Sequence, residues 1–220
     1  MDFIPAKESP FFISLFRWYT RLLFQRRFKR VWLKQEYDPC PECKTLYFLN
    51  HHSWWDGLTP FLLNEFRFNQ QARALMEEKQ MRRYPFFRKI GAFSIDRDNR
   101  RSAITSLRYA VQSFQRPQAS LFLYPEGTIT PVGSKMNFEG GLAWLHQKLP
   151  DVDFVPIAIH LHTIRHDKPE LNLHVGRPVR LDSERSNEER TQHFEQLMGA
   201  MLAELRQSAG FDDTEFEKFL

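Results

Sequence analysis

The segment Asn50-His51-His52-Ser53-Trp54-Trp55-Asp56-Gly57 follows directly on Thr45–Leu49, an apolar run with the length and composition of a short buried strand. A second apolar run, Leu121–Leu123, leads in the same way into Tyr124-Pro125-Glu126-Gly127-Thr128. The sequence therefore predicts two buried strands that each end in a polar loop.

The first polar loop carries the side chains that general-base chemistry requires. A histidine accepts a proton near neutral pH, and a carboxylate beside it fixes the tautomer and stabilises the imidazolium. His51 lies five residues before Asp56, and His52 lies four residues before it. A regular helix would favour His52 as the partner, whereas a bent segment would allow His51. The spacing alone leaves both pairings open.

Strand-like and helix-like segments alternate along the 220 residues, a length that suits one domain. Strands are expected at 45–50, 72–76, 92–96, 120–124, 154–160 and 171–175. Helices are expected at 100–115, 138–148 and about 186–207, the first and third with an apolar face. This alternation predicts a single α/β domain with a central mixed sheet flanked by helices. We divide the chain into an N-terminal segment, residues 1–35, and a main domain, residues 36–220.

Basic and aromatic residues are concentrated in the N-terminal segment. Residues 1–34 hold eight Lys or Arg residues against two acids, although the whole chain has a formal charge of only +4. Its apolar residues fall at helical spacing: Phe12, Leu15, Phe16, Tyr19, Leu22 and Leu23. This pattern predicts an amphipathic helix at a membrane surface, with aromatic rings at the acyl boundary and cations at anionic headgroups. The alternative is a helix packed on the core with a solvated basic face.

The membrane prediction has further support along the chain. Residues 82–89 repeat the basic-aromatic mixture, whereas no stretch reaches the roughly 18–20 uncharged residues of a spanning helix. The early apolar run is interrupted by Arg17, which does not fit a signal peptide. A peripheral or monotopic protein on the cytoplasmic face of a membrane is therefore expected. We expect no nucleic acid partner, since no recognition motif accompanies the basic residues.

Two cysteines, Cys40 and Cys43, form the sequence Cys-Pro-Glu-Cys. A structural zinc site needs four ligands, and the chain has no second cysteine pair. Pro39 and Pro41 predict a connecting loop in place of the helix start expected of a redox-active pair. The expectation is two reduced thiols in a turn.

Four blocks of the chain, in order, resemble the glycerolipid (lysophospholipid) acyltransferase family. The first block is Asn50-His51, followed by four residues and Asp56. The other three are Gly91-Ala92-Phe93-Ser94-Ile95-Asp96-Arg97, Tyr124-Pro125-Glu126-Gly127-Thr128 and Val155-Pro156-Ile157-Ala158-Ile159. They extend over residues 50–159, half of the chain. Any one block alone is weak evidence for the family, but four blocks in the family's order are specific evidence for it.

The resemblance implies transfer of a fatty acyl group from an acyl thioester, either acyl-CoA or acyl carrier protein, to a lipid hydroxyl. It implies His51 as the general base and Asp56 as its orienting partner. The acceptor would be bound by Arg97, Glu126, Gly127 and Thr128. Amides of the Glu126–Thr128 loop are candidates to stabilise the oxyanion. No covalent acyl-enzyme is required, and no metal or tightly bound cofactor is implied. The expected partners are a membrane lipid surface, the acyl donor and the lipid acceptor.

Two positions depart from the family pattern. The family's third block usually continues with an arginine, where this chain has Ile129, and a basic residue often precedes the later glycine, where this chain has Glu139. Such cations help to hold the phosphate of lysophosphatidate. Arg97 remains, with Arg100 and Arg101 nearby. The departures predict an acceptor other than lysophosphatidate: a neutral lipid hydroxyl, a sugar hydroxyl on a glycolipid or carotenoid glycoside, or an aminolipid.

The sequence leaves open two other functions and the role of two tryptophans. His51, His52 and Asp56 could be ligands of a metal-dependent hydrolase, with His160, His162, His166 and His174 as a further cluster. The chain could also be a non-catalytic lipid-binding module on the same scaffold. Trp54 and Trp55 could pack in the core or contact lipid.

Overall fold

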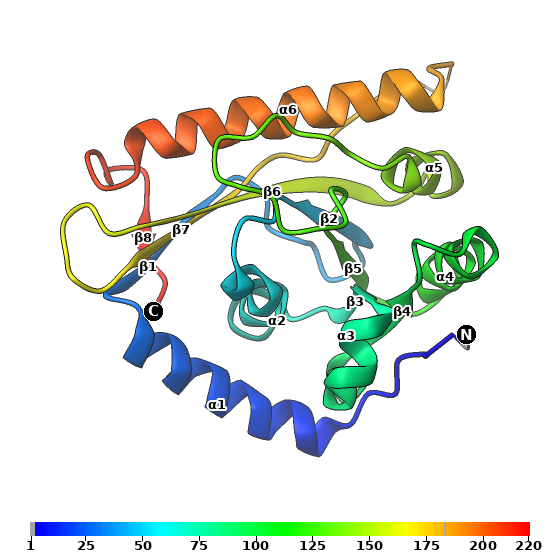
Figure 1. Cartoon of the computed structure of the whole chain (residues 1–220), viewed down its shortest axis with the longest axis horizontal. Helices are drawn as coiled ribbons and strands as arrows, with labels where there is room; N and C mark the ends of the chain where they lie inside the picture. Colours follow the sequence, from blue (N-terminus) through cyan, green and yellow to red (C-terminus); the bar gives the residue numbers. More distant parts are fainter. Residues whose placement is uncertain (1–2, 183) are drawn as a thin grey trace.

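The computed structural model describes residues 3–182 and 184–220, which form one mixed sheet of eight strands covered by helices on both faces (Figure 1). The strands are β1 (Arg30–Gln35), β2 (Thr45–Leu49), β3 (Gln71–Glu77), β4 (Ala92–Ile95), β5 (Ala119–Leu123), β6 (Asp153–His162), β7 (Glu170–Val175) and β8 (Glu217–Lys218). Their order in the sheet is β4-β3-β5-β2-β6-β7-β1-β8. The prediction of a single α/β domain with a central mixed sheet is confirmed.

Strands β4, β3, β5, β2 and β6 are parallel to one another, whereas β7 runs antiparallel to β6. The helices are α1 (Pro10–Arg27), α2 (Thr59–Leu63), α3 (Glu78–Arg83), α4 (Arg100–Ser113), α5 (Gly141–Lys148) and α6 (Asn187–Ser208). Three short turns of other helix types are η1 (Trp54–Leu58), η2 (Asn64–Phe68) and η3 (Pro85–Ile90). Because the five parallel strands end at the same edge, the polar loops after β2, β4 and β5 meet there.

The core has two layers because the central strands are buried on both faces. Leu46 and Phe48 of β2 pack on the face covered by α4, α5 and α6, and Tyr47 and Leu49 pack on the face covered by α1 and α2. In Figure 1, α6 and α1 lie on opposite sides of the sheet. All five residues of β2 are buried, which explains why it appears in the sequence as an uninterrupted apolar run.

The six predicted strands are present, and the three predicted helices are found at α4, α5 and α6. The helix expected from residue 138 begins only at Gly141. Two strands, β1 and β8, were not predicted. β1 lies in the N-terminal segment of residues 1–35 and pairs with β7, with Val31 and Leu33 each 1% exposed. Its alternating arginine and lysine residues concealed its two buried positions.

Helix α1 begins at the N-cap Ser9, whose hydroxyl accepts from the Phe12 amide, and Pro10 occupies its first turn. Phe16, Thr20 and Phe24 form its buried face. Large apolar side chains on the outer face are exposed: Phe11, Leu15, Trp18, Tyr19 and Leu22. The predicted apolar stripe is thus divided between the core and the solvent. Within residues 3–182 and 184–220, none of the helices combines the length and the hydropathy needed to cross a membrane.

The two tryptophans after β2 differ in environment. Trp55 packs edge-on against Phe24 and Phe28 at the end of α1, whereas Trp54 is 61% exposed. Core packing is therefore the role of Trp55, and Trp54 extends the exposed aromatic surface beside α1.

The prediction of two reduced cysteines is wrong, because Cys40 and Cys43 form a disulfide. The amide of Cys43 donates to the carbonyl of Cys40 in a tight turn, and the two Cα atoms are 5.0 Å apart. This separation lies within the range that a disulfide spans. The turn from Cys40 to Cys43, which contains Pro41, is what brings the two sulfurs together.

Candidate active site

His51 and Asp56 lie together where β2 ends. Residue 50 leaves the strand, and the chain bends into the short turn η1, which returns the Asp56 carboxylate to the His51 ring. The distance from His51 Nδ1 to Asp56 Oδ2 is 3.3 Å. The backbone bend that a five-residue spacing requires is therefore present.

The Asp56 carboxylate is held in place by the segment that carries it. Its Oδ2 accepts hydrogen bonds of 2.7 Å from the amides of His52 and Ser53, and its Oδ1 accepts one of 2.7 Å from the Ser53 hydroxyl. Asp56 is only 1% exposed. These donors stabilise the buried negative charge and fix the orientation of the carboxylate.

His52 has a different environment. Its Nδ1 is 3.0 Å from the carbonyl oxygen of Thr130, and its Nε2 is 3.2 Å from Nη2 of Arg206. Of the two pairings that the spacing allowed, the ring contact with Asp56 thus belongs to His51, and His52 contributes only its amide.

Tyr124 supports the pair from the end of β5. Its ring stacks on the His51 imidazole with centroids 4.4 Å apart, and its hydroxyl donates to the carbonyl of Asp56. Burial raises the pKa of Tyr124 well above its usual value, and the Asp56 charge adds to the effect, so the phenol stays protonated as a donor. Tyr124 belongs to the third of the four sequence blocks, but the sequence predicted no role for it. The sequence offered one signal for such a role, because Tyr124 directly follows an apolar strand, as the histidine block does.

Glu126 connects the loop after β5 to the histidine loop. It is buried, its Oε2 accepts from the His51 amide at 3.1 Å, and its Oε1 accepts from the Thr130 hydroxyl at 2.9 Å. The amide of Thr130 donates to the carbonyl of His51 at 2.8 Å. Both oxygens of the predicted acceptor-binding carboxylate thus have partners within the protein, and they hold the backbone of His51.

Gly127 occupies a left-handed backbone conformation with φ of +69°, which favours glycine. A Cβ at this position would collide with the guanidinium of Arg97, so the absence of a side chain lets Arg97 approach. The Gly127 amide donates to the carbonyl of Tyr124 at 2.9 Å, which closes the turn. The next residue, Thr128, is exposed and lines the cavity described below.

Arg97 follows β4 and reaches the same place. Its Nη1 is 2.7 Å from Oε1 of Glu139, in the segment before α5. Arg97 is thus brought together with Gly127, but its charge is paired with one of the two residues that depart from the family pattern. Ile129, the other departure, is 54% exposed.

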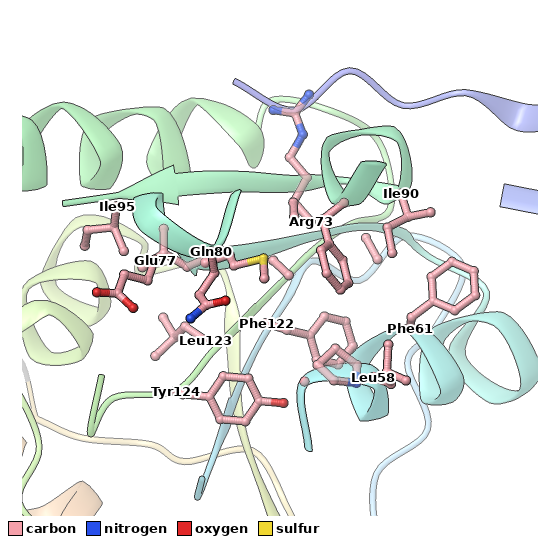
Figure 2. A pocket seen from close by; sticks show the side chains of 18 of the residues that line it. Leu58, Phe61, Arg73, Glu77, Gln80, Ile90, Ile95, Phe122, Leu123 and Tyr124 are labelled. Carbon is pink, nitrogen blue, oxygen red and sulfur yellow. The ribbon is translucent and has the colours of Figure 1, made fainter. Parts of the chain in front are cut away.

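A cavity of about 1150 Å³ extends from His51 and Tyr124 along the sheet to α1 and η3. Figure 2 shows Tyr124 and Leu123 toward one end of it, near Glu77 and Gln80, and Phe61 and Ile90 toward the other. Much of the lining is apolar: Leu23, Leu58, Phe61, Ala74, Phe86, Phe87, Ile90 and Phe122. The cavity also reaches Arg97, Gly127 and Glu139. Its apolar part suits a long hydrocarbon chain, and His51 lines the same cavity.

The other histidines do not converge on one point. His162 Nε2 lies 3.1 Å from Oδ1 of Asn172, and His174 Nε2 lies 3.2 Å from Oε1 of Glu36. Burial lowers the pKa of His160 to about 4. Among residues 3–182 and 184–220, no three His, Cys, Asp or Glu side chains are placed to hold a metal ion. The arrangement thus offers a base with a buried carboxylate partner at the end of a large apolar cavity.

Comparison with known proteins identifies the family of the chain. A family model described as "Acyltransferase" matches residues 33–160, more than half of the chain. A 1-acyl-sn-glycerol-3-phosphate acyltransferase from Cocos nucifera is 24% identical over 172 residues, which cover 73% of this chain and 53% of that protein. The chain thus matches about half the length of this relative.

Among solved structures, the 1-acyl-sn-glycerophosphate (LPA) acyltransferase PlsC from Thermotoga maritima is similar, with a TM-score of 0.64 and 18% identity. The similarity covers 88% of this chain and 80% of the Thermotoga maritima chain. At this identity the likeness concerns the fold.

Proposed function

Because the chain belongs to the acyltransferase family, we propose that it transfers a fatty acyl group from acyl-CoA or acyl carrier protein to a lipid hydroxyl, with His51 as the general base. The observation that carries the proposal is the contact of 3.3 Å between His51 Nδ1 and the buried Asp56, at the end of an apolar cavity. With its Nδ1 proton directed to Asp56, the His51 ring presents Nε2 as the acceptor of the hydroxyl proton.

The reaction needs no covalent acyl-enzyme. Nε2 of His51 removes the proton as the acceptor oxygen attacks the thioester carbonyl, and Asp56 stabilises the imidazolium that forms. The tetrahedral oxyanion then collapses, the carbon–sulfur bond breaks, and the thiolate receives the proton from the imidazolium. The Gly127 amide is already engaged with Tyr124, so we assign oxyanion stabilisation to the amides of Glu126 and Thr128.

The cavity provides a site for the acyl chain. Its lining by Phe61, Phe86, Phe87 and Phe122 matches the hydrocarbon of a fatty acid, and His51 lies where the carboxyl end would be. Burial of the chain contributes about 0.8 kcal/mol per methylene group. Remote apolar contacts thus hold the thioester against the base.

The acceptor proposed is a lipid without a phosphate monoester. A phosphate at Arg97 would meet the negative charge of Glu139, whose Oε1 lies 2.7 Å from Nη1 of the guanidinium. At the exposed position 129, an isoleucine provides no cation. A neutral lipid hydroxyl, a sugar hydroxyl on a glycolipid or carotenoid glycoside, or an aminolipid fits this charge balance.

Helix α1 is the proposed membrane contact. Its outer face exposes Phe11, Trp18 and Tyr19, and basic residues are interspersed along it. Tyr19 and Trp54 also line the cavity, so the exposed aromatic surface is continuous with the cavity wall. We infer peripheral association with anionic lipids on the cytoplasmic face of a membrane, from which lipid substrates would enter.

The first experiment measures thiol release from palmitoyl-CoA with a panel of acceptors in anionic vesicles. The panel contains lysophosphatidate, other lysophospholipids, glycosylated lipids and a simple lipid alcohol, and palmitoyl carrier protein is tested as a second donor. His51→Ala is expected to lower acceptor-dependent release by about 10²–10⁴-fold. The matched control is His193→Ala on α6, outside the cavity. Release that is unchanged by His51→Ala would contradict the mechanism.

A further inference from the structure

The ring of His52 lies outside the pair of His51 and Asp56, but both its nitrogens have partners. An arginine can only donate hydrogen bonds. Nε2, which lies 3.2 Å from Nη2 of Arg206, must therefore be the unprotonated nitrogen of His52. The proton is then on Nδ1, where it can be donated to the carbonyl of Thr130 at 3.0 Å. Arg206 and the Thr130 carbonyl thus favour the same tautomer of His52.

Thr130 in turn holds both sides of the His51 backbone. Its amide donates to the His51 carbonyl at 2.8 Å. Its hydroxyl donates at 2.9 Å to Glu126, which accepts from the His51 amide at 3.1 Å. A continuous chain of hydrogen bonds thus leads from Arg206 on α6 to the peptide groups on either side of the base. The segment after β5 also contacts α6 through the Phe138 amide and Glu195, and it lies in front of α6 in Figure 1.

The partial burial of Arg206 destabilises the folded state. Burial disfavours its charge and lowers its pKa, and within the described part of the chain its buried Nε has no hydrogen-bond partner. A buried polar group without a partner is rare and calls for an explanation. The contact of its Nη2 with His52 provides one.

We propose that Arg206 and His52 are positioning residues of the active site: Arg206 selects the Nδ1–H tautomer of His52, which fixes the Thr130 segment and thereby the His51 backbone. The consequence for turnover rests on the proposed function, because it requires His51 to be the base. The tautomer of His52 is independent of that function and can be observed without a substrate.

The first test is ¹⁵N NMR of the histidine rings in the full chain, with the His52 signals assigned by their loss in His52→Asn. A protonated and an unprotonated ring nitrogen have well-separated shifts. The wild type is expected to show Nδ1 protonated and Nε2 unprotonated, and Arg206→Met is expected to shift the ring toward the Nε2–H tautomer. The control Arg108→Met, at an exposed position of α4, should leave the signals unchanged. An Nε2–H tautomer in the wild type would overturn the proposal.

The second test is a double-mutant cycle on kcat and KM. Arg206→Met should lower kcat by about tenfold, as expected for one charge-assisted hydrogen bond, and leave KM for acyl-CoA unchanged. In His52→Asn, the side-chain amide can donate to Thr130 from the place of Nδ1 without help from Arg206. In that background Arg206→Met should therefore change kcat by less than about twofold. Equal losses in both backgrounds would contradict the proposal, whereas a wild type without transferase activity would contradict only the proposed function.

Discussion

At the scale of single residues, Asp56 is central to the candidate site. Its Oδ2 contacts the His51 ring and accepts two amides, and its Oδ1 accepts the Ser53 hydroxyl. The residue spacing left both His51 and His52 open as partners of this carboxylate, and the family resemblance implied His51. The choice depended on the backbone bend, which no spacing of side chains records.

Asp56→Asn is expected to lower kcat by about 10²-fold or more. The asparagine oxygen can accept the amides of His52 and Ser53, and its amide nitrogen can donate to the Ser53 hydroxyl, so the fold should persist. What is lost is the negative charge that stabilises the imidazolium. Thiol-release kinetics and a thermal melt measure the two effects, with the exposed Asp98→Asn as control. Wild-type turnover in Asp56→Asn would exclude the electrostatic role.

The acceptor preference is predicted from Glu139 and Ile129. In Glu139→Gln, Arg97 loses its ionic partner and becomes available to a phosphate, and Ile129→Arg adds a second cation. Charge-assisted bonds contribute roughly 1.5–3 kcal/mol each, so the double variant should raise kcat/KM for lysophosphatidate by about tenfold or more relative to a neutral acceptor. A wild type that already prefers lysophosphatidate would refute the acceptor assignment.

At the scale of elements, the strands that lead into the site were predictable because they are short and mostly apolar. Strand β1 was not predicted. Arg30 and Lys34 flank its buried Val31 and Leu33, and the segment was grouped with the basic helix before it. Its strand character comes from pairing with β7, whose residues lie about 140 positions away along the chain.

Helix α1 allows a prediction about membrane binding. The double variant Leu15→Ser, Trp18→Ser removes two exposed apolar side chains and is expected to weaken sedimentation with anionic vesicles by about tenfold or more. Phe211→Ser is the matched control, because Phe211 is 75% exposed but lies beyond α6. Equal binding by the two variants would show that α1 is not the contact.

At the scale of the whole molecule, the sheet is covered on both faces, and α6 crosses one face to reach the active-site edge with Arg206 (Figure 1). This layered packing also buries His146, whose Nδ1 lies 2.8 Å from Nη1 of Arg190. Burial, with a smaller effect of the Arg190 charge, lowers the pKa of His146 to about 4.

The protein should therefore lose stability as the pH falls from about 6.5 to about 4. The folded pKa values of His146 and His160 lie below the unfolded value, so the unfolded chain binds more protons in this window. His146→Gln keeps an acceptor for Arg190 without a titrating group. Urea unfolding at pH 5 and pH 7 should show a smaller loss of unfolding free energy in this variant than in the wild type. Equal losses would mean that His146 does not contribute.

The sequence by itself determined the fold class, the central strands, the three later helices and the blocks that carry His51, Asp56, Arg97 and Glu126. These follow from local composition, periodicity and motif order, which neighbouring residues specify. Only the tertiary structure decided that the amides of His52 and Ser53 hold Asp56, that Glu126 holds the His51 backbone, and that Glu139 pairs with Arg97. It also brought Cys40 to Cys43 and Arg206 to His52. Such contacts depend on backbone bends and on packing between residues far apart along the chain, which local patterns do not encode.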